Sequence, residues 1–210
     1  LQNRSERNAE RMVARFTIVG SNRSVLNAAN WLKKAGAFLQ GADSVEHARR
    51  LAPAPLAVLV SGDTGSAGPQ LDRGPTEIYL WDFEVGQRGP GAFASAVSGV
   101  SSVIGEAGGT PGILPVHVPE QWAGLFGANL ALGLQFINDN DQASRPRRID
   151  VSAADILRAF AEQNSGNHAG VPYGWRRNGR TAVEHGGVFP QGFFRCGDGF
   201  VAVQARSRQD

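Results

Sequence analysis

Cysteine is almost absent from this sequence: Cys196 is the only one in 210 residues, which excludes an internal disulfide framework. A lone cysteine fits a reducing compartment, so we expect a cytoplasmic protein. No stretch approaches the ~18–20 consecutive apolar residues of a membrane-spanning helix, and a membrane partner is not expected. Charged residues make up only 19% of the chain and the net charge is +2. Because no aromatic residues interleave with the small arginine clusters, we expect no nucleic-acid partner.

Several common functional motifs are also missing. The turn Gly20-Ser21-Asn22 lacks the Gly-x-Gly-x-x-Gly spacing that brings a backbone close to a pyrophosphate, so neither a nicotinamide nor a flavin cofactor is expected. There is no P-loop lysine motif and no Gly-x-Ser-x-Gly elbow of the serine hydrolases. No metal site is expected either, because the four histidines lie far apart in the sequence (His47, His117, His168 and His185).

Apolar residues, at 41%, are numerous enough to form a buried core, and their periodicity predicts alternating strands and helices. Strands are expected at residues 16–19, 37–39, 56–60 and 78–83, and helices at 25–35, 93–104, 119–137 and 153–160. The continuous apolar run 56–60 is typical of a strand that is buried on both faces of a parallel sheet. Ser152, with Asp155 three residues later, resembles a capping box. The sequence therefore predicts an α/β fold with a Rossmann-like parallel sheet and flanking helices.

The end of the chain has a different pattern. Residues 192–203 predict a β-hairpin that turns at Gly197-Asp198-Gly199. We expect residues 1–13 to be a linker or tail, 14–151 a Rossmann-like large domain, and 152–181 a connecting helix and loop. Residues 182–210 would then be the first hairpin of a small second domain. Because both ends look cut, we expect the chain to be a fragment of a longer protein.

Five short signatures follow one another in the second half of the chain. They are Gly86-Gln87-Arg88-Gly89-Pro90, Ile104-Gly105-Glu106, the segment 118–125 (VPEQWAGL), the segment 147–152 (RRIDVS) and the segment 192–203 (GFFRCGDGFVAV). In this order they resemble the class III CoA-transferase family, which includes formyl-CoA transferase, carnitine CoA-transferases and α-methylacyl-CoA racemase. The resemblance covers roughly residues 14–210 and is best from Gly86 onward.

This resemblance implies a Rossmann-like large domain that binds coenzyme A, a small second domain, and two chains interlinked like rings. It implies acyl-CoA and carboxylic acid substrates, with coenzyme A entering as the substrate thioester and with no metal. Some members of the family carry two such halves in tandem. The compressed stretch between Val60 and Gly86 is more typical of a diverged half, so the partner is expected to be a second copy or a tandem half.

The resemblance also places a catalytic carboxylate. Family transferases use an aspartate just before the small residues that open the apolar helix, and the matching position ahead of Ala123-Gly124 is Glu120. The aspartate attacks a thioester and forms a covalent intermediate, and a glutamate in its place is one methylene longer. A second interpretation stays open. Glu120 directly follows Pro119 in the first turn of a helix, where an acid is stabilised by the helix dipole.

Other residues are predicted to contact coenzyme A because they follow strands, at the edge where α/β sheets bind ligands. They are Gly20, Ser21, Asn22, Ser61, Gly62, Gly86, Gln87 and Arg88. Each is equally well interpreted as a plain loop residue, and Arg88 as a solvated arginine. Gly186-Gly187 resembles the glycine-rich loop that covers the nucleophile in family transferases, although it is also typical of an ordinary turn.

Three functions are therefore compatible with the sequence. The first is transfer of coenzyme A between an acyl-CoA and a carboxylic acid, with Glu120 as the nucleophile. The second is a catalytically inactive half that serves assembly or binds coenzyme A in a tandem protein. The third is an α/β ligand-binding domain unrelated to coenzyme A. Racemisation is disfavoured, because the segment that carries the family's histidine is deleted between Pro90 and Phe93.

Overall fold

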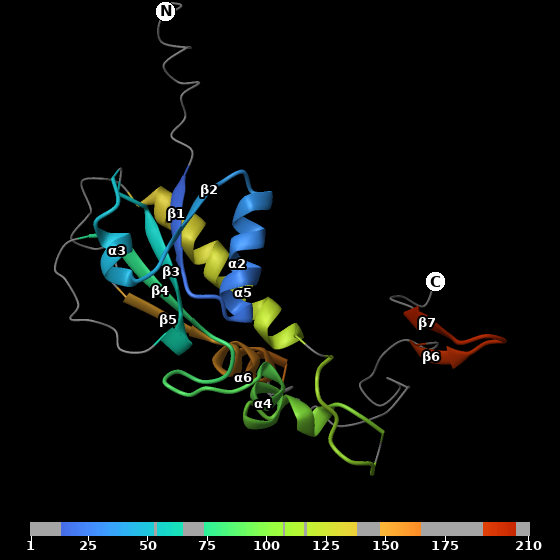
Figure 1. Ribbon diagram of the computed structural model, residues 1–210. Coiled ribbons are helices and arrows are strands. Elements are labelled where there is room, and N and C mark those ends of the chain that lie inside the picture. Colours follow the sequence, from blue (N-terminus) through green and yellow to red (C-terminus); the bar gives the residue numbers. More distant parts are fainter. Residues whose placement is uncertain are drawn as a thin grey trace, which may run out of the picture.

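Five parallel strands form the sheet at the centre of the protein, in the order β2-β1-β3-β4-β5 (Figure 1). The computed structural model describes residues 14–52, 54–64, 74–106, 108–115, 117–137, 148–164 and 191–204. The strands are β1 (Arg15–Val19), β2 (Phe38–Ala42), β3 (Ala57–Ser61), β4 (Thr76–Trp81) and β5 (Arg148–Ser152). This is one of the two common orders of doubly wound sheets, and it confirms the predicted α/β fold.

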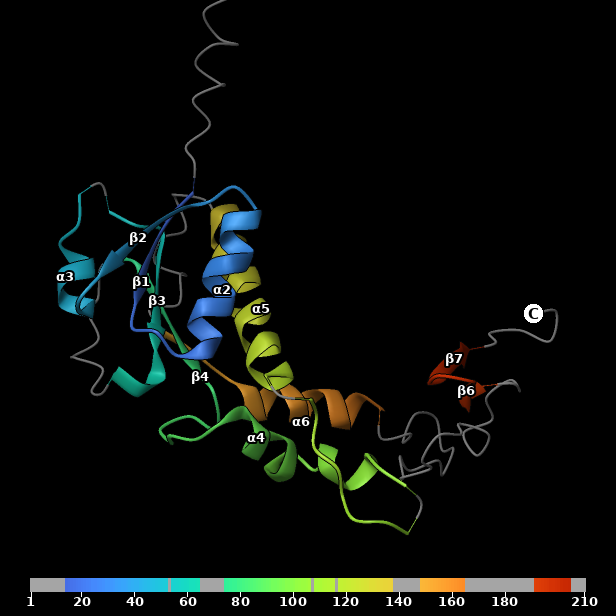
Figure 2. The same ribbon diagram turned by 45° about the vertical axis from the view of Figure 1, so that its right-hand side comes forward.

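The two central strands are buried along their whole length. Every residue of β3 and of β4 is buried, as predicted for β3 from its uninterrupted apolar run. On one face of the sheet, α2 (Arg23–Lys34) and α5 (Val118–Gly133) lie side by side, as both ribbon views show (Figures 1 and 2). The short helix α3 (Val45–Arg49), which the sequence did not predict, packs on the other face. The main core therefore lies between the sheet and the α2–α5 pair.

A second layer of helices lies beyond the carboxyl ends of the strands. It contains α4 (Gly91–Val97), the 3-10 turn η2 (Val100–Val103) and α6 (Ala153–Asn164). These elements share a small core with the start of α5, built around Phe83, Ala94, Ala123 and Leu157. Further 3-10 turns are η1 (Gly62–Thr64), which directly follows β3, and η3 (Leu134–Phe136), which follows α5.

The predicted helix over residues 93–104 is wrong in its extent. Helix α4 ends at Val97, and Gly99 adopts a left-handed conformation with a φ of 82° before η2 begins. The predicted single apolar face is therefore divided: Val100 is buried and Ile104 packs on the same core, whereas Phe93 and Val97 are exposed. The capping box at the start of α6 is confirmed: the Ser152 hydroxyl accepts a hydrogen bond from the Asp155 backbone N–H at 3.0 Å.

The predicted hairpin is formed by β6 (Gln191–Arg195) and β7 (Phe200–Gln204), which pair antiparallel. The Cys196 N–H donates to the Gly199 carbonyl across the turn. Residues 1–13, and most of the stretch predicted as a connecting loop, lie outside the described residues. Within the parts of the chain that the structure describes, no helix is long and apolar enough to cross a membrane.

Close packing of α5 on α2 fixes the position of the start of α5. The buried residues of α5 include Ala123, Gly124, Gly127 and Ala128, a face of small side chains. A Cβ added at Gly124 would lie 2.7 Å from the Ser24 carbonyl oxygen and 2.9 Å from the Ala28 backbone nitrogen. The backbones of the two helices therefore approach each other at a distance that only glycine permits at this position.

We predict that Gly124→Ala destabilises the protein by about 1–3 kcal/mol, because the added methyl group must push α5 away from α2. Gly133→Ala is the matched control, since this residue also lies in α5 and a Cβ there meets nothing within 4 Å. The control is expected to leave stability unchanged or to raise it by about 0.5–1 kcal/mol. Denaturant unfolding of the two variants checks this, and an equal effect of both substitutions would contradict the packing argument.

Candidate functional site

The carboxyl ends of the parallel strands meet at one edge of the sheet, next to the layer that contains α4 and α6 (Figure 2). Gly20 follows β1, Ser61 ends β3, Asp82 follows β4 and Ser152 ends β5. In doubly wound sheets this is the edge at which ligands bind. The polar residues that gather there are therefore the candidates for a functional site.

Asp82 joins the end of β4 to the first turn of α2. Its Oδ1 accepts hydrogen bonds from the Ser24 backbone N–H at 2.8 Å and from the Ser24 hydroxyl at 2.6 Å, and its Oδ2 accepts from the Arg23 N–H at 3.1 Å. These N–H groups are among those that an α-helix leaves without partners at its N-terminus. Asp82, a carboxylate of the protein itself, therefore accepts the hydrogen bonds of the N–H groups that bind a phosphate in many α/β proteins.

Glu120 lies in the first turn of α5 and is only 3% exposed. Its Oε1 accepts a hydrogen bond from the Gly91 backbone N–H at 3.1 Å, so the carboxylate also contacts the first residue of α4. A Cβ at Gly91 would overlap this carboxylate. The other oxygen, Oε2, is buried and has no hydrogen-bond partner among the described residues. Burying a carboxylate oxygen without a hydrogen-bond partner costs stability, and such atoms are rare in native structures. Glu120 is therefore a candidate functional residue.

His117 connects Glu120 to the start of α2. Its Nδ1 lies 3.8 Å from Glu120 Oε1, and its Nε2 lies 2.7 Å from Arg23 Nη1. The imidazole is 37% exposed, whereas the Glu120 side chain is 4% exposed. The residue precedes α5 and has a φ of 72°, the only positive φ of a non-glycine residue in the described part of the chain.

Most of the residues after β1 and β3 that were predicted to contact coenzyme A instead pack against, or hydrogen-bond to, other parts of the protein. Asn22 caps α2, since its Oδ1 accepts from the Val25 N–H, and its Nδ2 donates to the Leu80 carbonyl. Gly20 has a φ of 85°, and a Cβ there would lie 2.7 Å from Thr64 Cγ2. Ser61 is buried, and Gly62 packs so closely on the Trp81 ring that no side chain fits. Ser21 is exposed. The structure brings these residues together at the sheet edge, mainly as parts of its turns.

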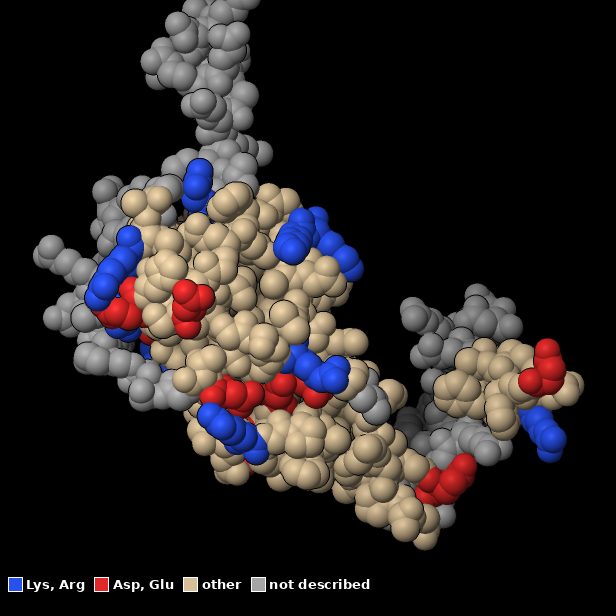
Figure 3. Space-filling view, in the orientation of Figure 1, with Lys and Arg blue, Asp and Glu red and all other residues tan. Residues whose placement is uncertain are grey.

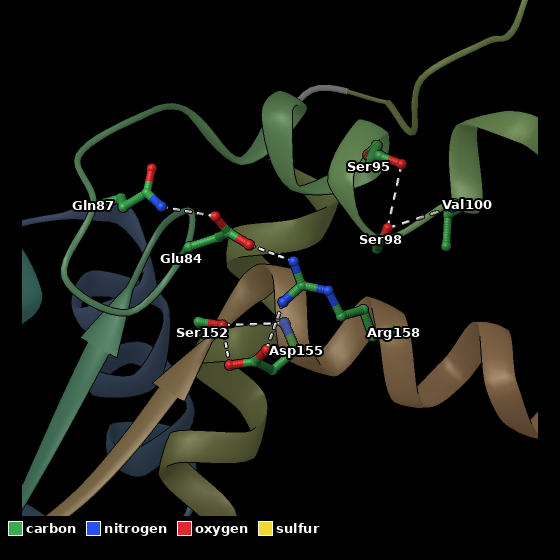
Figure 4. A network of polar contacts seen from close by, with 8 residues as sticks. All are labelled: Glu84, Gln87, Ser95, Ser98, Val100, Ser152, Asp155 and Arg158. Atoms are coloured by element: carbon green, nitrogen blue, oxygen red, sulfur yellow. Dashed lines mark hydrogen bonds and ion pairs between the residues drawn. The ribbon is translucent and has the colours of Figure 1, made fainter.

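The loop after β4 presents the next predicted residues. Gly86, Gln87 and Arg88 are all exposed. Gln87 Nε2 donates to Glu84 Oε2 at 3.0 Å, and Arg88 Nη2 donates to the Asp63 carbonyl at 2.7 Å. Glu84 in turn pairs with Arg158 of α6, which also binds Asp155 (Figure 4). The loop is thereby tied to α6 on one side and to η1 on the other.

Acidic side chains gather between basic ones on the side of the molecule where the strands end (Figure 3). Burial, followed by the nearby negative charge of Asp82, raises the pKa of Asp63 above its ordinary value, and Arg88 partly offsets this effect. A carboxyl group with a raised pKa at a ligand-binding edge is a candidate functional residue, although ion-pair networks have the same effect.

Reasoning from the sequence missed five residues of this site: Arg23, Asp63, Asp82, Gly91 and His117. Two signals were present, because Asp82 directly follows a buried strand and Gly91 follows the Gly-Gln-Arg-Gly-Pro signature. No local pattern joins His117 to Arg23, which is 94 residues away. Gly186-Gly187 lies outside the described residues. No group of three histidine, cysteine, aspartate or glutamate side chains that could hold a metal occurs in the described ranges.

Solved structures with the same fold extend this description. A CAIB/BAIF family protein from Brucella suis superimposes with a TM-score of 0.66 at 12% identity, covering 91% of this chain and 65% of its own. The hypothetical protein Rv3272 from Mycobacterium tuberculosis gives a TM-score of 0.64 at 15% identity, covering 92% of this chain and 64% of its own. This chain therefore spans about 65% of the length of these proteins. At such low identity the likeness establishes the fold alone.

Sequence comparison adds the family. A search of curated proteins gave no match. The sequence profile of CoA-transferase family III, in contrast, matches residues 84–210, which is more than half of the chain. The matched region begins just after β4 and contains the loop with Arg88, helix α5 with Glu120, strand β5 and the hairpin. The chain belongs to CoA-transferase family III.

Proposed function

We propose that this chain transfers coenzyme A between an acyl-CoA and a carboxylic acid, with Glu120 as the nucleophile. The observation that carries the proposal concerns a carboxylate that is almost completely buried beside the strand ends: its Oε2 has no hydrogen-bond partner among the described residues. In the proposal, this carboxylate takes the place of the aspartate of the family's transferases, because it precedes the small residues Ala123-Gly124 of the same helix. Family membership supports the reaction class, and the geometry of Glu120 supports its role.

The proposed chemistry needs no reactant beyond the two substrates. Glu120 Oε2 attacks the carbonyl carbon of the acyl-CoA, the C–S bond breaks, and a mixed anhydride and the CoA thiolate form. The thiolate then attacks the glutamyl carbonyl of the anhydride, which releases the first carboxylate and leaves a glutamyl-CoA thioester. An acceptor carboxylate repeats both steps in reverse order and restores the free Glu120 carboxylate.

The contacts of the carboxylate favour one oxygen as the nucleophile. Oε1 is held by the Gly91 N–H at 3.1 Å, and this bond orients the whole carboxylate. Oε2 accepts no hydrogen bond from the described residues, so its lone pairs are not engaged by the protein there. A buried nucleophile is also shielded from water, which protects the anhydride and the thioester from hydrolysis.

The substrate is proposed to lie along the strand ends, with the loop 84–90 as its contact surface. Arg88 is exposed there and is suited to a phosphate of coenzyme A. The family's interlinked dimer or tandem pairing is part of the same proposal. The acyl group and the acceptor acid are not specified by these residues.

Racemisation is not part of the proposal. A two-base racemase must place the α-carbon between two proton-transferring groups, each about 3 Å away. At this site His117 and Glu120 are one such pair, and their facing atoms are 3.8 Å apart. A carbon atom does not fit between them.

One observation favours a second candidate, a catalytically inactive half that binds coenzyme A or serves assembly. Both the first residue of α4 and the body of α5 enclose the Glu120 carboxylate, so a thioester reaches Oε2 only if the side chain or α4 moves. In that case Glu120 serves to join two helices.

We predict that Glu120→Gln abolishes transfer, with a loss of at least about 10³-fold in kcat, because a neutral amide cannot take the place of the attacking carboxylate. Glu120→Asp is the matched variant that keeps the carboxylate. It moves the reacting oxygen by about 1 Å, so we expect a loss on the order of 10²-fold. Steady-state transfer assays on the full-length protein measure both values.

The covalent intermediate gives a direct check. Incubation with an acyl-CoA followed by hydroxylamine should convert Glu120 to its hydroxamate, which peptide mapping identifies. Full turnover with an unmodified Glu120 peptide would remove this residue from the mechanism. Tight binding of coenzyme A without turnover in the wild type would favour the inactive half.

We also predict that Gly91→Ala lowers kcat by about 10²-fold, because its methyl group displaces the carboxylate and misaligns the nucleophile. The packing control Gly133→Ala should retain wild-type activity, since a Cβ there contacts nothing. Transfer assays and thermal unfolding, run in parallel, separate misalignment from loss of fold. A fully active Gly91→Ala enzyme would show that the observed Glu120 position is not the reactive one.

A further inference from the structure

The backbone of His117, directly before α5, is strained. Its φ of 72° places a residue with a bulky side chain in the left-handed region, which is uncommon outside glycine. Such conformations cost of order 1–3 kcal/mol and gather at functional sites. At this position the conformation brings the imidazole between Arg23 and Glu120.

Arg23 determines which ring nitrogen of His117 carries the proton. A guanidinium group has only donors, and its Nη1 lies 2.7 Å from His117 Nε2. Nε2 must therefore accept, so the proton of the neutral imidazole is on Nδ1. That N–H faces Glu120 Oε1 at 3.8 Å. The distance is about 1 Å longer than a hydrogen bond, and catalytic contacts commonly tighten to hydrogen-bond length when substrate binds.

We infer that His117 Nδ1–H and the Gly91 N–H form an oxyanion hole for Oε1 of Glu120, and that Arg23 is the positioning residue that keeps the imidazole in the donating tautomer. The inference rests on the proposed function. It assigns different roles to the two carboxylate oxygens: Oε2 attacks the substrate, while Oε1 becomes the carbonyl oxygen of the enzyme-bound intermediates.

This oxyanion hole acts in two specified steps. When the CoA thiolate attacks the glutamyl carbonyl carbon of the anhydride, the C=O electron pair moves onto Oε1, and both N–H groups donate to the resulting oxyanion. When the electron pair returns, the bond to the bridging oxygen breaks and the first carboxylate leaves. Attack of the acceptor carboxylate on the glutamyl-CoA thioester places the same charge on Oε1, and there the CoA thiolate leaves. Hydrogen-bond donors aimed at a developing charge are among the largest catalytic contributions.

The test compares two substitutions that both tolerate the left-handed backbone. His117→Gly removes the imidazole without adding strain, and we expect kcat to fall about 10²–10³-fold while KM for the acyl-CoA stays about the same. His117→Asn also accepts a positive φ and carries an amide N–H donor, so we expect it to recover part of the lost rate. The assays use the full-length protein with an acyl-CoA and a carboxylic acid acceptor, and thermal unfolding is measured for each variant.

A second pair of variants tests the tautomer without altering His117. Arg23→Lys keeps a cationic donor and should stay within about tenfold of wild-type kcat. Arg23→Met removes the donor to Nε2, so the neutral ring is free to carry its proton on either nitrogen. We expect its kcat to fall below that of Arg23→Lys, towards the level of His117→Gly.

Wild-type transfer with a Glu120 hydroxamate, combined with an unchanged kcat in His117→Gly, would overturn the oxyanion hole and leave the proposed function standing. The same holds if Arg23→Lys and Arg23→Met have equal rates. Absence of transfer and of a Glu120 adduct in the wild type would instead overturn the proposed function itself.

Discussion

The position of the Glu120 carboxylate depends on one constraint, the approach of α5 to the backbone of α2. Gly124 lies one turn after Glu120 and permits this approach, because a Cβ there would meet the Ser24 carbonyl oxygen at 2.7 Å. The beginning of α2 is itself held to β4 by Asp82, which accepts from the N–H groups of Arg23 and Ser24. The strand end, the start of α2 and the start of α5 are therefore joined into one rigid unit. Arg23 and Glu120 project from two ends of that unit towards His117.

Within this unit, the free N–H groups at the N-terminus of α2 donate to a carboxylate of the protein and not to a substrate phosphate. In many doubly wound proteins the first helix after the first strand offers its free N–H groups to a phosphate. Here Asp82 satisfies them from inside the fold. The exposed Arg88, on the loop after β4, is likewise held from inside the fold, because it donates to the Asp63 carbonyl. The raised pKa of Asp63 is a consequence of the same arrangement, because burial and the Asp82 charge both disfavour its ionised form.

The sequence predicted the layers of the fold well and the contacts of the site poorly, for a physical reason. Apolar runs such as residues 56–60 record burial on both faces of a strand, and the Ser152–Asp155 pair records a local cap, so both are readable over a few residues. The helix over 93–104 failed because Gly99 interrupts it with a left-handed turn while the apolar spacing continues. Glu120 was singled out through its place ahead of Ala123-Gly124. Its partner Gly91 could not be inferred, because that contact is set by how α4 and α5 meet. His117 lies only three residues before Glu120, but their approach depends on the left-handed backbone at His117, which no sequence pattern indicates.

Glu120 and Gly91 depend on each other for space and for hydrogen bonding. A side chain longer than aspartate by one methylene needs more room at the start of α5, and the absence of a Cβ at Gly91 supplies that room. The same glycine gives its N–H to Oε1, so the space that admits the longer side chain also fixes the direction of its carboxylate. An acid that served only to stabilise its own helix would gain from staying solvated at the first turn, where its charge is least costly. Glu120 is instead enclosed with one oxygen bound and the other without a partner in the described structure. Stabilisation of the helix alone therefore does not account for the buried position of this carboxylate.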